Sequence, residues 1–142
     1  MGKEEKVNRL TPEPDTLREL YLKSGNRCSF PGCDHVMIDG EGNFVGQICH
    51  IEAAKEGGER FNPDQSNEVR RQAANLMLMC YKHHVATNDV DAFPVARLCR
   101  IKAEHEKIYS DIVGSMLLTV SAHTVHWEPA FAKNLKRMDD IL

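Results

Sequence analysis

Four residues in two closely spaced pairs could bind a metal ion. Cys28 and Cys33 are separated by four residues that include a Pro-Gly turn, and Cys80 and His83 are separated by two residues. Structural zinc is bound by four sulfur or nitrogen ligands in a tetrahedron, and two such pairs supply a complete set. The spacing therefore predicts a structural Zn²⁺ site, whereas the alternative is a group of buried free thiols that pack in the core.

A second histidine, His84, directly follows His83. Neighbouring side chains on a helix point roughly 100° apart, so one imidazole can bind zinc while the other faces a different site. The spacing favours His83 as the zinc ligand, but the opposite assignment, with His84 on the zinc, also fits. His35 is near enough in sequence to Cys33 to compete for the metal, and Cys49 is a further alternative ligand.

Short elements before and between these pairs must bring them together. A helix is predicted from Pro14 to a stop at Gly25, just before Cys28. The runs "HVMI" and "FVGQICHI" flank the turn-forming stretch "DGEGN", and this pattern predicts a β-hairpin whose second strand ends near His50. The mixture of short strands and helices predicts an α+β fold.

Helices are expected to dominate the rest of the chain. A loop over 53–65 is followed by a short helix over 66–74 that Ser66 could cap, and Asn75 lies at its end, where asparagine tolerates the left-handed conformation. Another short helix is expected over 80–88, and a longer packing helix over 94–113 carries apolar residues at helical spacing.

The length of 142 residues fits one domain with a single core. Residues 1–12 are polar and predict a disordered tail, and residues 114–142 predict a C-terminal extension with a strand and then a short amphipathic helix. No apolar run approaches the roughly 20 residues that cross a membrane, and we find no export signal. We therefore expect no membrane partner and a cytoplasmic location.

Cysteine content and charge narrow the function classes. Five cysteines in a chain without a secretion signal favour metal binding over a disulfide framework. The net charge of −3 argues against a broad basic surface, although a local basic patch remains compatible with it.

Three motifs between the zinc pairs resemble the HNH endonuclease family. They are "ICHIEA", which contains His50, "NLMLMC", which begins with Asn75, and "CYKHH", which ends with His84. The resemblance covers about residues 27–88. Together with "RCSFPGC" and "GGERFN", these motifs look most like the HNH modules of bacterial anti-phage defence effectors, including those fused to cyclic-nucleotide-sensing SAVED domains. The implied fold is a zinc-anchored ββα-metal core, a β-hairpin followed by a helix, with flanking helices at both ends.

The resemblance implies catalytic roles for three residues. His50 would be the general base that takes a proton from water, since imidazole titrates near neutral pH. Asn75 would orient His50 or bind the metal directly. His84 would hold a catalytic divalent cation, Mg²⁺, Mn²⁺ or Ni²⁺, that stabilises charge on the scissile phosphate. Many members have Asp directly before the first histidine, but here Cys49 stands there, and a thiol is a poor ligand for Mg²⁺.

The implied activity is hydrolysis of phosphodiester bonds in double-stranded DNA with little sequence specificity, in anti-phage defence or restriction. Arg60, Arg70 and Arg71 are candidate substrate-binding residues, although Arg60 could be structural and the other two could belong to a solvated charged face. Because the chain is not basic, tight DNA binding would need a homo-oligomer or a fused or associated sensor domain. A zinc-stabilised nucleic-acid-binding module without full catalytic power and a ribonuclease are the alternatives.

Overall fold

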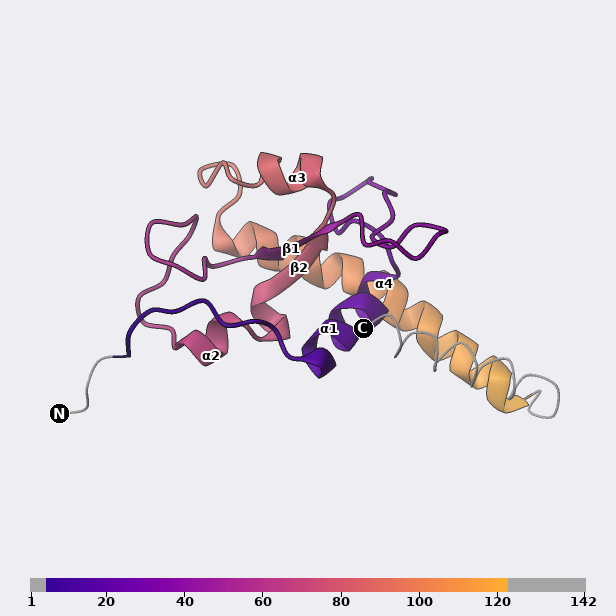
Figure 1. Ribbon diagram of the computed structural model, residues 1–142. Helices are drawn as coiled ribbons and strands as arrows, with labels where there is room; N and C mark the ends of the chain where they lie inside the picture. Colours follow the sequence, from indigo (N-terminus) through magenta and orange to yellow (C-terminus); the bar gives the residue numbers. More distant parts are fainter. Residues whose placement is uncertain (1–4, 123–142) are drawn as a thin grey trace.

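The computed structural model describes residues 5–122, with side chains as far as residue 110. Helices and a two-stranded sheet make up this part of the chain (Figure 1), so the predicted α+β class is confirmed. The elements in chain order are α1 (Pro14–Ser24), β1 (Gln47–His50), α2 (Asn67–Arg70), the 3-10 helix η1 (Ala73–Asn75), β2 (Leu76–Met79), α3 (Tyr81–Ala86) and α4 (Val95–Ala122).

The sheet pairs β1 with β2 in antiparallel register, from Gln47 opposite Met79 to His50 opposite Leu76. All four residues of β2 are at most 2% exposed. A strand that is buried on both faces carries apolar residues at every position, which explains the sequence LMLM. Figure 1 shows α3 on one side of the strands and α1 on the other, so β2 lies at the centre of the core.

The predicted hairpin between "HVMI" and "FVGQICHI" is only partly formed. The Asp39 amide donates to the Asn43 carbonyl at 3.0 Å and the Val45 amide donates to the Met37 carbonyl at 2.7 Å, but these bonds form only an isolated bridge between Ile38 and Phe44. Phe44 remains 47% exposed. Because the apolar run of β2 offers β1 more surface to bury, the strand that ends at His50 pairs with β2 instead.

Helix α1 ends as the sequence predicts. Gly25 adopts the left-handed conformation with φ of 61°, and its amide donates to the Leu22 carbonyl. A side chain there would also collide with α4, since a Cβ atom would overlap Cδ1 of Tyr109. His105 of α4 donates from Nε2 to the Ser24 carbonyl at 2.8 Å, which fastens the two helices together.

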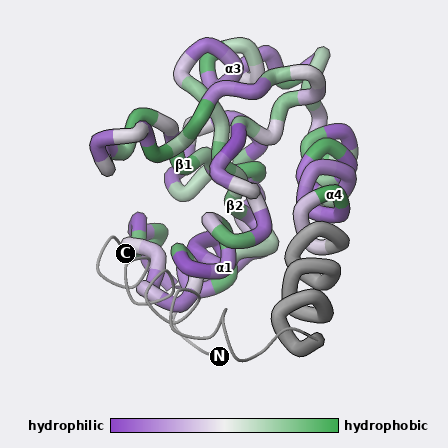
Figure 2. Tube along the Cα trace, turned by 90° about the vertical axis from the view of Figure 1, so that its right-hand side faces the viewer, coloured by the Kyte–Doolittle hydropathy of each residue, from purple (hydrophilic) through white to green (hydrophobic). Residues whose placement is uncertain are grey.

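The long helix α4 extends further than predicted, to Ala122 rather than residue 113. The strand expected after Gly114 therefore does not form over 115–122, because a short apolar run alone cannot distinguish a strand from a continuing helix. The helix expected near the C-terminus lies outside the described residues. In Figure 2 the described turns of α4 alternate between hydrophobic and hydrophilic residues, in keeping with one buried stripe. Across residues 5–122, no helix combines the length and apolar character that crossing a bilayer requires.

The N-terminal segment over 5–13, which we call the strap, differs from the predicted disordered tail. The side chain of Asn67 accepts a hydrogen bond from the Asn8 amide at 2.9 Å and donates to the Lys6 carbonyl at 2.8 Å. Further along, Arg71 donates to the Thr11 carbonyl at 3.0 Å. These contacts hold the strap against α2, as the indigo trace that leads to α1 in Figure 1 shows.

The single short helix predicted before β2 forms as two separate short helices, α2 and η1. Ser66 caps α2 as predicted, because its hydroxyl accepts a hydrogen bond from the Val69 amide. The helix then stops at Arg70, and η1 completes the segment. The described non-glycine residues with positive φ are Asn26 and Arg60, so Asn75 does not use the left-handed conformation considered from sequence.

Candidate functional site

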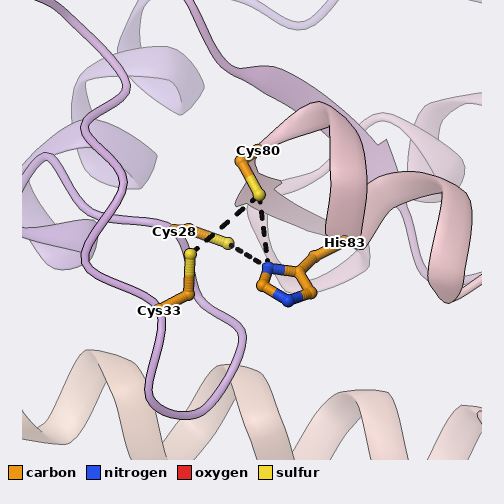
Figure 3. A group of neighbouring side chains, drawn as sticks. All are labelled: Cys28, Cys33, Cys80 and His83. Atoms are coloured by element: carbon orange, nitrogen blue, oxygen red, sulfur yellow. Dashed lines mark hydrogen bonds between the residues drawn. The ribbon is translucent and has the colours of Figure 1, made fainter.

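The four predicted zinc ligands lie together at one point (Figure 3). The ligand atoms of Cys28, Cys33, Cys80 and His83 all fall within 4.8 Å of one another. Nδ1 of His83 is 3.2 Å from the sulfur of Cys80 and 3.7 Å from that of Cys28, and the Cys33 and Cys80 sulfurs are 4.0 Å apart. In a tetrahedral zinc site with Zn–S bonds of about 2.3 Å, the sulfurs are about 3.8 Å apart. The cluster could therefore hold a structural metal such as zinc.

Local turns explain why these side chains converge. The Cys33 amide donates to the Phe30 carbonyl at 3.1 Å across a turn in which Gly32 has φ of 77°. Cys80 occupies the N-cap of α3 in an extended conformation, so His83 follows on the first turn of that helix. The Phe30 ring stacks on the His83 ring with centroids 4.0 Å apart, which fixes the direction of the imidazole.

Burial shifts the pKa of Cys28 and that of His83 in opposite directions. Burial raises the pKa of Cys28 to about 12, so without a cation its neutral thiol is favoured. Partial burial, helped by the charge of Lys82, lowers the pKa of His83 and favours the neutral imidazole that binds metals. A bound divalent cation would supply the positive charge that stabilises thiolates in this buried place.

A cleft of about 280 Å³ adjoins this cluster, and both His50 and His84 line it. His50 comes from the end of β1 and His84 from α3, so the pairing of β1 with β2 brings them together. Nδ1 of His84 lies 3.1 Å from the sulfur of Cys49, which is 4% exposed. It is thus His83, not His84, that belongs to the four-residue cluster. Cys49 is outside the cluster as well, and His35 instead contacts the Val36 carbonyl through Nδ1.

His50 offers an unused nitrogen. Its Nε2 atom is buried and has no hydrogen-bond partner among the described residues. Burial, with a smaller contribution from the positive charge of Arg9, lowers the pKa of His50 to about 4. The imidazole is therefore neutral at pH 7 and can accept a proton.

Asn75 holds the backbone that follows His50. Its Oδ1 accepts from the Glu52 amide at 2.9 Å, and its Nδ2 donates to the carbonyls of Glu52 and Arg70 at 2.9 and 2.8 Å. The backbone carbonyl of Asn75 also accepts from the Ile51 amide. Since Asn75 is 7% exposed and these bonds engage both polar atoms of its side chain, the geometry suits the orienting role better than metal binding.

Arg60 is engaged with the protein itself. It has φ of 60°, and its guanidinium donates to the carbonyls of Ile51 at 2.7 Å, Thr87 at 2.8 Å and Phe93 at 3.3 Å. These bonds tie the loop after β1 to the end of α3. The geometry therefore matches the structural alternative considered from sequence for this residue.

Arg70 and Arg71 are also occupied by protein groups. Arg70 is 3% exposed and donates to Oδ1 of Asn67 and to the Asn62 carbonyl, both at 3.0 Å. Arg71 pairs with Glu68 at 2.7 Å and reaches the strap. Neither guanidinium lines the cleft that contains His50.

Arg9 is a cleft residue that sequence reasoning missed. It lies on the strap and lines the cleft together with His50. No motif or periodicity marks it, because its position depends on hydrogen bonds between the side chains of Asn67 and Arg71 and backbone groups far away in the sequence. A single sequence does not reveal contacts of this kind.

Two groups thus make up the candidate site, the Cys3His cluster and the adjoining cleft. Helix α3 links them, because His83 belongs to the first and His84 to the second. Neither models of known protein families nor curated proteins, when compared with this chain, match it.

Proposed function

We propose that this chain is a metal-dependent HNH endonuclease that hydrolyses phosphodiester bonds of double-stranded DNA with little sequence specificity, in anti-phage defence or restriction. The observation that carries the proposal is that His50 and His84 line one cleft beside a Cys3His cluster. The order β1, β2, α3 and the antiparallel pairing of the strands support a ββα-metal core. In this reading the long connection between the strands replaces the tight hairpin.

In the proposed reaction, His50 takes a proton from a water molecule as the water oxygen attacks phosphorus. The bond from phosphorus to the 3'-oxygen breaks, and the leaving 3'-oxygen takes a proton from a solvent water, which leaves a 5'-phosphate and a 3'-hydroxyl. A pKa of about 4 makes free His50 a weak base. The negative charge of a bound phosphate would raise that pKa toward the range in which a general base is most effective.

His84 would hold the catalytic divalent cation, which would supply positive charge to the leaving oxygen. Cys49 is the neighbouring potential ligand, with its sulfur 3.1 Å from Nδ1 of His84. Burial raises the pKa of Cys49 to about 12, so a cation that recruits the thiolate must displace its proton. Sulfur ligation favours Ni²⁺ over Mg²⁺, with Mn²⁺ between them.

Plasmid nicking tests this proposal directly. The His50→Ala variant should cut supercoiled plasmid at least about 100-fold more slowly than wild type, the scale of a lost general base. His35→Ala is the matched control, because His35 is exposed and lies outside both groups of the site. Each protein is assayed with Mg²⁺, Mn²⁺ and Ni²⁺ after its folding and zinc content are compared. If His50→Ala nicks at the wild-type rate, His50 is not the base.

One observation favours a second candidate, a zinc-stabilised nucleic-acid-binding module without catalysis. The position before His50 carries a buried thiol rather than a carboxylate, and that thiol contacts His84. Under this alternative, wild-type protein would bind duplex DNA but leave plasmid intact with every cation. Parallel digestion of an RNA substrate separates deoxyribonuclease from ribonuclease activity.

A further inference from the structure

Two positively charged side chains at the cleft have no hydrogen-bond or ion-pair partner among residues 5–110. Arg9 and Lys55 are exposed, line the cleft, and have no side-chain hydrogen bond or ion pair within residues 5–110. Arg60, the third cation of the cleft, is bound to three backbone carbonyls. The positive charge that remains available to a ligand therefore comes from the strap and from the loop after β1.

Arg9 and His50 line the same two hollows. One is the cleft of about 280 Å³, and the other is a hollow of about 310 Å³ between the strap and Ile48 of β1. An anion that reaches His50 from either hollow would therefore pass close to the guanidinium of Arg9.

The strap is held in place without help from the Arg9 side chain. On one side of Arg9, Asn67 bonds to the backbone of Lys6 and Asn8, and on the other side Arg71 bonds to the Thr11 carbonyl. The backbone of Arg9 is thus fixed at both ends while its guanidinium stays exposed. Such an arrangement lowers the entropic cost of ligand binding, because less of the site must be ordered.

We propose that Arg9 is a substrate-positioning residue whose guanidinium binds a backbone phosphate of a nucleic acid beside His50, with Lys55 as a second phosphate contact. This inference rests on the proposed nuclease function and adds the strap to the segments that line its site. The planar guanidinium can donate two parallel hydrogen bonds to one phosphate, which sets its orientation as well as its distance.

Salt-dependent binding of DNA tests this role. A short fluorescent duplex is titrated with His50→Ala protein, which removes the proposed base and so prevents cutting during the measurement, at several salt concentrations. Each phosphate contact contributes about −0.9 to the slope of log K against log salt. Adding Arg9→Gln should make the slope shallower by about one and weaken binding several-fold.

Arg100→Gln is the matched control, since Arg100 is an exposed arginine on α4 that does not line the cleft. It removes the same charge and should change the slope much less. Equal effects of the two substitutions, or no effect of Arg9→Gln, would overturn the assignment. If wild-type protein cuts neither DNA nor RNA, the nuclease proposal fails by itself, while the binding comparison still decides whether Arg9 contacts phosphate.

Release of the strap gives an independent test. Asn67→Ala removes the hydrogen bonds to the strap backbone and should weaken DNA binding, and Arg9→Gln should then cost little more. If the losses of DNA affinity in the two single variants simply add in the double variant, the strap does not hold Arg9 in its binding position. Because Asn67 also contacts Arg70, thermal unfolding of each variant is compared first, and Arg9→Gln alone remains decisive if Asn67→Ala is unfolded.

Discussion

His83 and His84 are neighbours in sequence, yet they belong to groups of opposite character. His83 faces three sulfurs and is stacked against Phe30, so its group is closed and provides a complete set of four ligands. His84 lines a cleft in which, among residues 5–110, a nitrogen of His50 and the charge of Arg9 have no partner, so this group is open. Structural metal sites are saturated by protein ligands, whereas catalytic sites keep a position free.

Under the proposed function, the two groups would separate stability from chemistry within one small domain. The closed group joins two distant turns of the chain, one at Cys28 and one at Cys80. The open group contains a buried nitrogen of His50 that has no partner among the described residues, which costs stability. It also contains the exposed side chain of Arg9, which is available to a ligand. Variants that remove one group and spare the other test this separation.

Loss of a cluster ligand should have the largest effect. Cys80→Ser removes a sulfur from the closed group, so the protein should lose bound metal and most of its cooperative thermal unfolding transition, because metal binding and folding are coupled. The control is Cys99→Ser, which changes an exposed cysteine outside the cluster. Elemental analysis and calorimetry measure the two outcomes, and a Cys80→Ser protein with full metal content and an unchanged transition would contradict the metal assignment.

Removal of the Asn75 side chain should have an intermediate effect. Asn75→Ala leaves the Glu52 amide and the carbonyls of Glu52 and Arg70 without their partner in a buried place. We expect the free energy of unfolding in urea to fall by about 2–4 kcal/mol. Asn88→Ala, at an exposed position on the rim of the cleft, should change it by less than about 0.5 kcal/mol. Bound metal should stay unchanged in both variants.

The smallest expected effect is the change in the free energy of unfolding that comes from protonation of His50. Its pKa in the folded protein is lowered to about 4 from an ordinary value of 6.5, so the unfolded chain binds this proton more readily. The stabilisation that neutral His50 provides is therefore complete above pH 6.5 and is lost as the pH falls toward and through 4. The imidazole resonance of His50 in an NMR titration should have its midpoint near 4. A midpoint near 6.5 would show that the imidazole is not buried as described.

Features that depend on local spacing could be predicted from the sequence. The stop of α1 at Gly25, the cap at Ser66 and each of the two ligand pairs of the Cys3His cluster depend on residues a few positions apart. The pairing of β1 with β2 could not be predicted in this way, because it joins segments separated by a long connection. The run LMLM gave no alternation from which a strand could be recognised, since both of its faces are buried.

The same limit applies to the candidate site. His50 and His84 were predicted to act together, and the structure places both at one cleft. Arg70 was a candidate substrate contact because it precedes Asn75, but its guanidinium is buried against Asn62 and Asn67. Arg9 was assigned to a tail, although the strap brings it to the cleft. Whether an arginine is free to meet a ligand depends on its long-range partners, which its sequence neighbours do not specify.

The alignment of His50 opposite Leu76 has a consequence for how this protein could be altered. Side chains alternate between the two faces of a strand, so moving β1 by a single position along β2 would interchange the faces of Cys49 and His50. An insertion within the segment 51–75 would cost little extra closure entropy. An insertion inside β1 would instead present sulfur where the imidazole now stands.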